Sequence, residues 1–271
     1  MNVVVCVKYV PDATGDRHFE ADNTVDRVGV DGLLSELDEY AVEQALQIKE
    51  AGAGSEEVVV TVLSVGPEQA TDAVRKALQM GADRGVHVRD EAIAGSDSLA
   101  TSLVLAKAVE KIGSEAGWDV VVCGMASTDG SMGVVPAMLS ERLGVPGVTL
   151  GSEVEVSQGE GGQVVRIRRD GDFSTQTVEG SLPLVLSVTD QSGEARYPSF
   201  KGIMAAKKKP MQTWALVDLG LDAGQVGLSA AWTAVQDSTA RPPRSAGEIV
   251  ADEDGSGAAA LVDFLAAKKF I

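Results

Sequence analysis

The stretch Trp118-Asp-Val-Val-Val-Cys-Gly-Met-Ala-Ser-Thr-Asp-Gly-Ser-Met-Gly133 passes from a short apolar run into a polar, glycine-rich loop. An unbroken apolar run of this length is typical of a strand that is buried on both faces of a parallel sheet. Helical periodicity returns at Pro136–Leu143, so the loop joins the end of a strand to the start of a helix. This strand–loop–helix unit indicates an α/β domain.

The same unit recurs along the chain before this stretch. Apolar runs predict strands, and apolar residues at helical spacing predict the helices that follow them. The predicted strands are Val3–Val7, Val58–Val65 and Gly85–Val88, and the predicted helices are Leu37–Ala51, Glu68–Met80 and Asp97–Gly113. Strands that alternate with helices of this length are joined by right-handed crossovers and form a parallel sheet. Ser35 and Asp38 suit the start of the first helix, where a carboxylate lies near the positive end of the helix dipole.

The pattern changes after Thr149. Short apolar runs separated by glycine-rich turns indicate antiparallel hairpins on one side of the sheet. They are Val154–Val156, Val164–Ile167, Phe173–Val178 and Leu184–Val188. Beyond Pro210 the chain is rich in Gly, Ala and Ser, and it contains one more predicted helix, Ala258–Lys268. A segment with so few apolar residues is not expected to fold alone, and we expect it to wrap a partner protein.

A basic segment, Arg196–Lys209, interrupts a chain whose formal net charge is −17. Its cations are Arg196, Lys201, Lys207, Lys208 and Lys209, it contains no acid, and its apolar side chains include Tyr197, Phe200, Ile203 and Met204. Cations mixed with an aromatic side chain are typical of a surface that meets an acidic partner. The alternative is a solvated linker between two elements. Composition alone does not decide between these two interpretations.

Composition limits the class of protein. The 271 residues are 44% hydrophobic, and no apolar run approaches the roughly 18 residues that a membrane-spanning helix needs. The acidic balance argues against non-specific binding to nucleic acid. Cys6 and Cys123 are far apart and each lies in a predicted strand, which favours a reducing compartment. Because no signal or transit segment precedes Val3, we expect a cytoplasmic protein.

One segment, the loop after Cys123, has the features of a ligand-binding site. His18 and His87 lack metal-ligand spacing, and the sequence contains neither a nucleophile elbow nor a P-loop motif. The loop and its flanks offer glycines and hydroxyl side chains: Gly124, Gly130, Gly133, Ser127, Thr128 and Ser131. The helix N-terminus that follows supplies free N–H groups and positive potential. The loop is therefore either a phosphate cradle or a plain connection.

Other segments are expected around the same pocket. Ligands of a parallel sheet bind beyond the carboxyl ends of neighbouring strands. This rule places Cys6, the pair Val65-Gly66 and the segment Ser35–Asp38 beside the loop after Cys123. We find no nucleophile or general base in that group. The pocket is therefore interpreted as a site that holds a nucleotide without reacting with it.

Five segments resemble the beta subunit of electron transfer flavoprotein, and they run through almost the whole chain. They are Val7–Asp12, Leu37–Leu46, Ala77–Asp83, Gly124–Pro136 and Pro198–Lys209. The last is highly specific, because few families combine that apolar core with a triple lysine. The resemblance implies an α/β fold: a parallel-sheet, Rossmann-like adenine-nucleotide-binding domain of the HUP type, with a short antiparallel extension. The implied boundaries are 1–190 for this domain, 191–212 for a partner-recognition loop and 213–271 for a C-terminal arm that packs on an alpha subunit.

The resemblance also implies a function. In that family the alpha subunit holds most of the FAD, and the beta subunit binds AMP in a structural role. The recognition loop docks flavin dehydrogenases, such as acyl-CoA dehydrogenases. Electrons pass one at a time from the dehydrogenase flavin to the carrier flavin, and then to a membrane quinone reductase. The chain would thus be an electron carrier subunit in fatty acid oxidation, and not an enzyme.

Site residues are carried over from the family position by position. The implied AMP site comprises Cys6, Ser35, Glu36, Leu37, Asp38, Val65, Gly124, Met125, Ala126, Ser127, Thr128, Asp129, Gly130, Ser131, Met132, Gly133, Val134 and Val135. The implied docking site comprises Arg196, Tyr197, Phe200, Ile203, Met204, Lys207, Lys208 and Lys209. Three positions depart from the family pattern: Ser35–Asp38 replaces a segment that is often Asn-Pro-x-x, Val134 replaces a frequent Gln, and Phe200 replaces the common Leu anchor. Two polar contacts of the family site are therefore unmatched here, and the docking anchor is larger.

Two alternatives stay open. The beta subunit of an electron-bifurcating flavoprotein would hold FAD in the same pocket, with NADH as the electron donor. The identity of the bound nucleotide would distinguish that protein from an AMP-binding carrier. A stand-alone protein that binds or hydrolyses adenine nucleotides belongs to another class. The basic segment and the C-terminal arm argue against it, because neither serves such a role.

Overall fold

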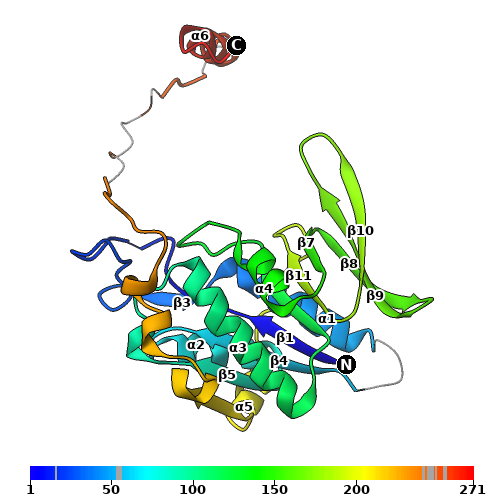
Figure 1. Cartoon of the computed structure of the whole chain (residues 1–271). Coiled ribbons are helices and arrows are strands. Elements are labelled where there is room, and N and C mark those ends of the chain that lie inside the picture. Colours follow the sequence, from blue (N-terminus) through cyan, green and yellow to red (C-terminus); the bar gives the residue numbers. More distant parts are fainter. Residues whose placement is uncertain (16, 53–56, 240–241, 243–246, 248, 253–254) are drawn as a thin grey trace. The chain divides into compact units, whose positions relative to one another are not determined.

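The computed structural model describes residues 1–15, 17–52, 57–239, 242, 247, 249–252 and 255–271. The chain divides into two units, Met1–Gln236 and Asp237–Ile271. The first unit contains a seven-stranded, a three-stranded and a two-stranded sheet (Figure 1). In the described part of the second unit, the helix is α6 (Gly257–Ala267).

The seven-stranded sheet is parallel throughout, in the order β12-β5-β4-β1-β6-β11-β7. Its strands are β1 (Asn2–Cys6), β4 (Val59–Val65), β5 (Arg84–Val88), β6 (Val120–Gly124), β7 (Gly147–Gly151), β11 (Leu184–Val188) and β12 (Met211–Trp214). The α-helices of this unit are α1 (Glu36–Glu50), α2 (Ala70–Met80), α3 (Ser98–Ala116), α4 (Val135–Leu143) and α5 (Phe200–Ala206). Short 3-10 helices are η1 (Glu91–Ile93), η2 (Leu216–Leu219), η3 (Ala223–Gln225) and η4 (Leu228–Ala230). The α/β class and the parallel sheet predicted from the alternation are confirmed.

Helices cover both faces of this sheet, which explains the unbroken apolar runs. In β1, Val3 and Val5 pack in one core cluster with residues of α1 and α2. Val4 and Cys6 pack in a second cluster with residues of α3 and α4. Because successive side chains of a strand point to opposite faces, both sets of positions in such a strand are buried and most of them are apolar. Full burial of one valine side chain stabilises the fold by about 1.5 kcal/mol or more.

The N-termini of two helices show how the sequence determines where a helix begins. Helix α1 begins directly after Ser35, as predicted, but the Ser35 hydroxyl makes no capping hydrogen bond. Helix α3 begins after Asp97, whose carboxylate accepts the N–H of Ala100 at 2.9 Å. Asp38 lies in the first turn of α1, where the helix dipole favours negative charge.

One predicted strand belongs to a different sheet. Leu184–Val188 is β11, which lies between β6 and β7 in the central sheet, and not in the antiparallel extension. The extension consists of β8 (Glu153–Gly159), β9 (Gly162–Asp170) and β10 (Thr175–Ser181). All five residues of β11 are buried, as expected of a strand with helices on both faces. The prediction was wrong because β11 follows the hairpin strands directly in sequence.

The chain beyond Pro210 continues the first unit as far as Gln236. Strand β12 pairs with β5 at the edge of the sheet. Trp214, Leu216, Leu219, Leu221 and Val226 are buried in the core cluster on the α3 side. This part therefore packs on its own domain, and the predicted start of the arm at residue 213 does not coincide with the boundary between the units.

A small antiparallel pair, β2 (Tyr9–Pro11) and β3 (Gly32–Leu34), precedes α1.

Candidate functional site

The carboxyl ends of β1 and β6 mark the point where the order of the sheet reverses. The chain adds β4 and β5 on one side of β1 and then returns to place β6 on the other side. Open α/β sheets bind ligands in the crevice at such a point. Helix α1 is the first helix after β1, and α4 is the first helix after β6. The start of α1 and the loop Met125–Val134, which we call the β6 loop, therefore lie beside the place where a ligand is expected, which we call the crevice.

The end of β6 and the start of α1 are in direct contact at Gly124. A Cβ atom added to Gly124 would lie 2.6 Å from Asp38 Oδ1 and 2.7 Å from the carbonyl oxygen of Leu37. Such distances are far below van der Waals contact, so no side chain fits. Asp38 accepts the backbone N–H of Lys8 at 2.8 Å and that of Gly124. One carboxylate thus ties the ends of β1 and β6 to α1.

The Asp38 carboxyl is poised to titrate near neutral pH. Its side chain is buried, and burial raises its pKa to about 7. The N–H groups of Lys8 and Gly124 and the Lys8 ammonium favour the charged form, but they do not overcome the loss of water around the carboxylate. The charge on Asp38 therefore changes within the physiological pH range.

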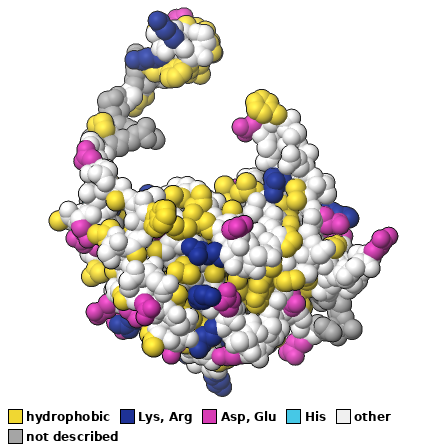
Figure 2. All heavy atoms as spheres, in the orientation of Figure 1, with side chains coloured by type: hydrophobic (Ala, Val, Ile, Leu, Met, Phe, Trp, Pro, Cys, Tyr) yellow, Lys and Arg dark blue, Asp and Glu magenta, His cyan; other side chains and the backbone are white. Residues whose placement is uncertain are grey.

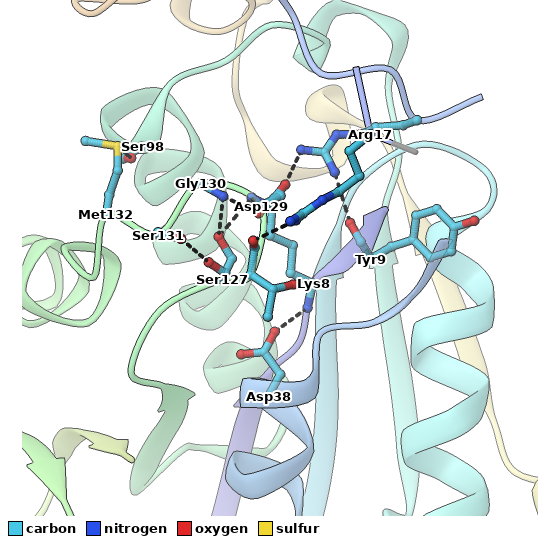
Figure 3. Close-up of polar contacts among 12 residues, drawn as sticks. Lys8, Tyr9, Arg17, Asp38, Ser98, Ser127, Asp129, Gly130, Ser131 and Met132 are labelled. Carbon is cyan, nitrogen blue, oxygen red and sulfur yellow. Dashed lines mark hydrogen bonds and ion pairs between the residues drawn. The ribbon is translucent and has the colours of Figure 1, made fainter. Parts of the chain in front are cut away.

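Cations gather on the β6 loop (Figure 3). Lys8 Nζ lies 2.8 Å from one oxygen of Asp129, and Arg27 Nη2 bonds to the other oxygen. Arg17 Nη1 donates to the carbonyl oxygen of Thr128 at 3.0 Å. Burial opposes the charge on Asp129, but Lys8 and Arg27 outweigh burial and hold its pKa well below the usual range. Lys8 and Arg27 contact this ionised carboxylate and Arg17 binds the neighbouring carbonyl, and cations grouped in this way suit a phosphate group.

The β6 loop is also ordered by its own hydrogen bonds. The Ser127 hydroxyl accepts the N–H of Gly130 at 3.3 Å, and the Ser127 carbonyl accepts the N–H of Ser131 at 2.9 Å. Gly133 has a φ of 66°, which favours glycine. An added Cβ on Gly130 would lie 3.4 Å from the Ser127 hydroxyl, an ordinary contact. Of the glycines predicted to admit a ligand, Gly124 and Gly133 are thus required by the chain itself, and Gly130 is not.

The structure brings the predicted nucleotide-site segments to one edge of the sheet. Cys6 ends β1, Val65 ends β4, Gly124 ends β6, and Ser35 immediately precedes α1. The remaining predicted residues lie in the first turn of α1 (Glu36, Leu37, Asp38) and from the β6 loop to the start of α4 (Met125, Ala126, Ser127, Thr128, Asp129, Gly130, Ser131, Met132, Gly133, Val134, Val135). Which of them contact a nucleotide stays a prediction.

Two of these positions have informative surroundings. The Cys6 side chain packs against Cys123 in the core cluster on the α3 side, and both cysteines are free thiols. The hydrogen bond to Cys6 and burial raise the pKa of Cys123 well above its usual value, which disfavours the thiolate of Cys123. The Ser35 hydroxyl is fully buried at the start of α1 and has no hydrogen-bond partner in the described part of the chain.

Three cations of this site were not predicted from the sequence. Lys8 belongs to a segment that matches the family, and its position directly after a strand end was an available signal. Arg17 and Arg27 lie more than 100 positions before the residues they contact on the β6 loop. Only the folded path of the segment between β2 and β3 places Arg17 and Arg27 there.

The predicted docking residues lie on and around α5. Tyr197 is 91% exposed and Phe200 is 80% exposed, and Ile203 and Met204 are also exposed. Lys201, Lys207 and Lys208 are exposed, whereas Arg196 and Lys209 are half-buried and hydrogen-bonded within the chain. Figure 2 shows Lys and Arg side chains at the surface where Figure 1 places α5. The segment is therefore a helix with an exposed apolar face, which is more than a solvated linker.

Other site types find no support in the described chain. Among the described residues, no group of three His, Cys, Asp or Glu side chains could hold a metal ion. No helix in the described ranges is long and apolar enough to cross a membrane. His87 is buried between the Thr71 hydroxyl at 3.2 Å and the Gly66 carbonyl at 3.1 Å, and burial lowers its pKa. His87 is thus held by hydrogen bonds inside the domain.

Comparison with known proteins identifies the family. The family model described as "Electron transfer flavoprotein domain" matches residues 22–219. The chain belongs to the electron transfer flavoprotein family. The electron transfer flavoprotein subunit beta of Mycobacterium tuberculosis (strain ATCC 25618 / H37Rv) is 44% identical over 272 residues, which cover 100% of this chain and 99% of the relative.

More distant relatives show the same relationship. The electron transfer flavoprotein subunit beta of Megasphaera elsdenii is 31% identical, with all of both chains covered. The "Caffeyl-CoA reductase-Etf complex subunit CarD" of Acetobacterium woodii is 33% identical and covers 92% of each chain. The resemblance predicted from the sequence is therefore confirmed. Membership supports a role in electron transfer with an associated flavin, and the designation beta implies an alpha subunit as partner.

Proposed function

We propose that this chain is the beta subunit of a heterodimeric carrier that takes electrons from flavin dehydrogenases and passes them to a quinone reductase. The observation that carries the proposal is the arrangement at the ends of β1 and β6, which combines the cations around Asp129 with a backbone fixed by Gly124 and Asp38. A crevice of this kind suits a nucleotide that is held and not transformed. FAD supplies the redox chemistry when bound, and in this proposal the alpha subunit holds most of it.

The residues at the crevice fit AMP. Lys8, Arg17 and Arg27 offer positive charge and N–H donors, which a monophosphate needs. The Ser35 hydroxyl is a buried polar atom without a partner in the described chain, at the helix end where a nucleotide would lie. We propose that these groups, with the segments predicted from the sequence, hold AMP as a structural ligand.

The outer surfaces support the proposed partners. Phe200 on α5 provides an exposed aromatic anchor, and the lysines around it suit an acidic docking site on a dehydrogenase, including the acyl-CoA dehydrogenases. In α6 of the second unit, Leu261, Val262 and Phe264 are exposed, so that helix has apolar surface to bury. We propose that the segment from Asp237 onward packs on the alpha subunit.

A second candidate has one specific observation in its favour. The relative from Acetobacterium woodii is named as a subunit of a caffeyl-CoA reductase complex. A bifurcating flavoprotein of that kind would hold FAD, and not AMP, in the crevice of this chain. The two candidates differ in the nucleotide that the complex contains.

One experiment separates them. The chain is co-expressed with its alpha subunit, the heterodimer is purified, and the released nucleotides are identified by mass and counted. One AMP and one FAD per heterodimer, with reduction of the flavin by an acyl-CoA dehydrogenase, support the carrier. Two FAD per heterodimer and reduction by NADH support the second candidate. A heterodimer without any nucleotide in this chain refutes both.

A further inference from the structure

Side-chain hydrogen bonds at both ends of the basic segment, Arg196–Lys209, bind it to helices of the domain. We infer that Arg196 and Lys209 are positioning residues that hold α5 in place, and that they do not contact the docking partner. This inference rests on the proposed docking role of α5. It divides the cations of the segment, which look equivalent in the sequence, into two groups with different functions.

Arg196 is bound to two glutamates of α1. Its Nε donates to Glu43 Oε2 at 2.7 Å and its Nη2 donates to Glu43 Oε1 at 2.9 Å, a bidentate arrangement. Nη2 also donates to Glu50 Oε2 at 3.0 Å, and Nη1 bonds to the other oxygen of Glu50. The backbone N–H of Arg196 adds a bond to Glu43 Oε2 at 3.2 Å. These bonds use most of the donors of the guanidinium group.

The electrostatics of this cluster agree with an internal role. The Glu43 side chain is 7% exposed and that of Arg196 is 32% exposed. Burial opposes the charge on Glu43, but the hydrogen bonds from Arg196 outweigh it and lower the Glu43 pKa. Hydrogen bonds to Glu43 and Glu50 raise the pKa of Arg196. One cation with two carboxylates has a net negative charge, so the cluster cannot attract an acidic partner.

The other end of the segment is fastened to the last turn of α2. Lys209 Nζ donates to the carbonyl oxygen of Leu78 at 2.9 Å, where the helix dipole favours a cation. Burial lowers the pKa of Lys209. Between the two fastened ends, Gly202 approaches the carbonyl oxygen of Gln79 so closely that an added Cβ would lie 2.4 Å from it. Helix α5 is thus seated on the end of α2.

A helix as short as α5 needs such support. It has seven residues, and helices of fewer than about 12 residues are marginal in water on their own. Between the two bound ends, Tyr197 and Phe200 stay exposed. Lys201, Lys207 and Lys208 are exposed and form no ion pair with any described residue, so they remain available to a partner. The apolar anchor is therefore presented in one orientation, which reduces the entropy lost on docking.

The test compares Glu43→Gln with Arg196→Gln in the complete heterodimer, using a flavin dehydrogenase as electron donor. Both variants release the N-terminal end of α5. Each is expected to raise the KM for the dehydrogenase about fivefold with kcat unchanged, since a mobile anchor binds less tightly. The dependence of KM on salt concentration should stay as in the wild type. The double variant should be no weaker than Arg196→Gln alone, because without Arg196 the substitution at Glu43 removes no further ion pair.

Direct contact between Arg196 and the partner would give the opposite pattern. Glu43→Gln would then leave KM unchanged or lower it, because the guanidinium would be freed for the partner. Arg196→Gln would flatten the salt dependence, as the exposed control Lys208→Gln is expected to do. Either of these outcomes overturns the inference.

Folding is controlled with a second variant and a second measurement. Glu50 is 60% exposed, so Glu50→Gln should leave the thermal midpoint unchanged while raising KM about twofold. Amide hydrogen exchange of residues 196–206 should be faster in Glu50→Gln than in the wild type, and unchanged exchange contradicts the inference. Phe200→Ala serves as the reference. If Phe200→Ala does not raise KM, the proposed docking role itself fails. If Phe200→Ala raises KM and the glutamate variants do not, only the positioning inference fails.

Discussion

The crevice at β1 and β6 and the segment around α5 use charged side chains in opposite ways. In the crevice, Asp38 and Asp129 are buried and bound to backbone N–H groups and cations of the same chain. On the outer side of α5, Lys207 and Lys208 are exposed and Phe200 is 80% exposed. A substitution in the crevice should therefore change folding and nucleotide binding, whereas one on the outer side of α5 should change only the encounter with a partner. The four predictions that follow test this division.

The largest effect is expected for Gly124→Ala. The new methyl group would overlap Asp38 and the Leu37 carbonyl, so α1 must move away from β6. Overlap with backbone should destabilise the heterodimer by about 3 kcal/mol and release its nucleotide. The control is Gly130→Ala, where the added methyl group has room. Thermal unfolding compares the two variants, and equal midpoints would contradict the close contact at Gly124. Nucleotide content is measured for Gly124→Ala alone, because Gly130 is itself a predicted nucleotide-site residue.

Asp38→Asn should have an effect that depends on pH. The folded-state pKa of about 7 lies above the unfolded value of about 3.9, so the folded state binds the proton more tightly. The contribution of Asp38 to stability is therefore highest below about pH 4 and falls as the pH rises to about 7. Asparagine does not ionise, so the stability deficit of the variant should shrink by about 2 kcal/mol between pH 5 and pH 8. Urea unfolding at the two pH values measures it, and a constant deficit would refute the shifted pKa.

Phe200→Ala should weaken docking and leave the crevice intact. A buried aromatic anchor contributes about 2 kcal/mol to an interface, which corresponds to a KM for the dehydrogenase raised about tenfold or more. Flavin reduction by a chemical reductant, nucleotide content and thermal midpoint should not change. Phe173→Ala is a control, because Phe173 is also an exposed phenylalanine but lies in the turn between β9 and β10. If Phe200→Ala accepted electrons normally from every dehydrogenase tested, α5 would be only a linker.

The smallest effect is expected for the exposed lysines. Lys207→Gln combined with Lys208→Gln should lower the association rate about threefold at low salt and flatten its salt dependence, because rim charges act mainly on association. Lys209→Gln should leave the salt dependence unchanged, since Lys209 is bound to the Leu78 carbonyl. Association rates measured by stopped-flow mixing over a range of salt concentrations distinguish the double lysine variant from Lys209→Gln. If Lys209→Gln flattened the salt dependence of the association rate as the exposed lysines do, steering and positioning cations could not be distinguished.

The sequence by itself determined the class of fold and the segments that form the crevice. A strand covered on both faces is apolar at most positions, so an unbroken apolar run such as Val120–Cys123 indicates burial on both faces. The glycine-rich loop after Cys123 could be placed at the carboxyl edge because parallel strands all end there. The family could be recognised because its matching segments span the chain.

The tertiary structure decided which residues meet. Arg196 pairs with Glu43 across 153 positions, and Arg27 pairs with Asp129 across 102 positions, so no local pattern in the sequence reveals either contact. The same holds for β11, whose sheet depends on where the chain returns after β10. The apolar pattern of a segment indicates whether the segment is buried, because burial constrains the type of each residue independently of the others. The partner of a charged side chain depends on how distant segments cross, and only the folded chain sets that crossing.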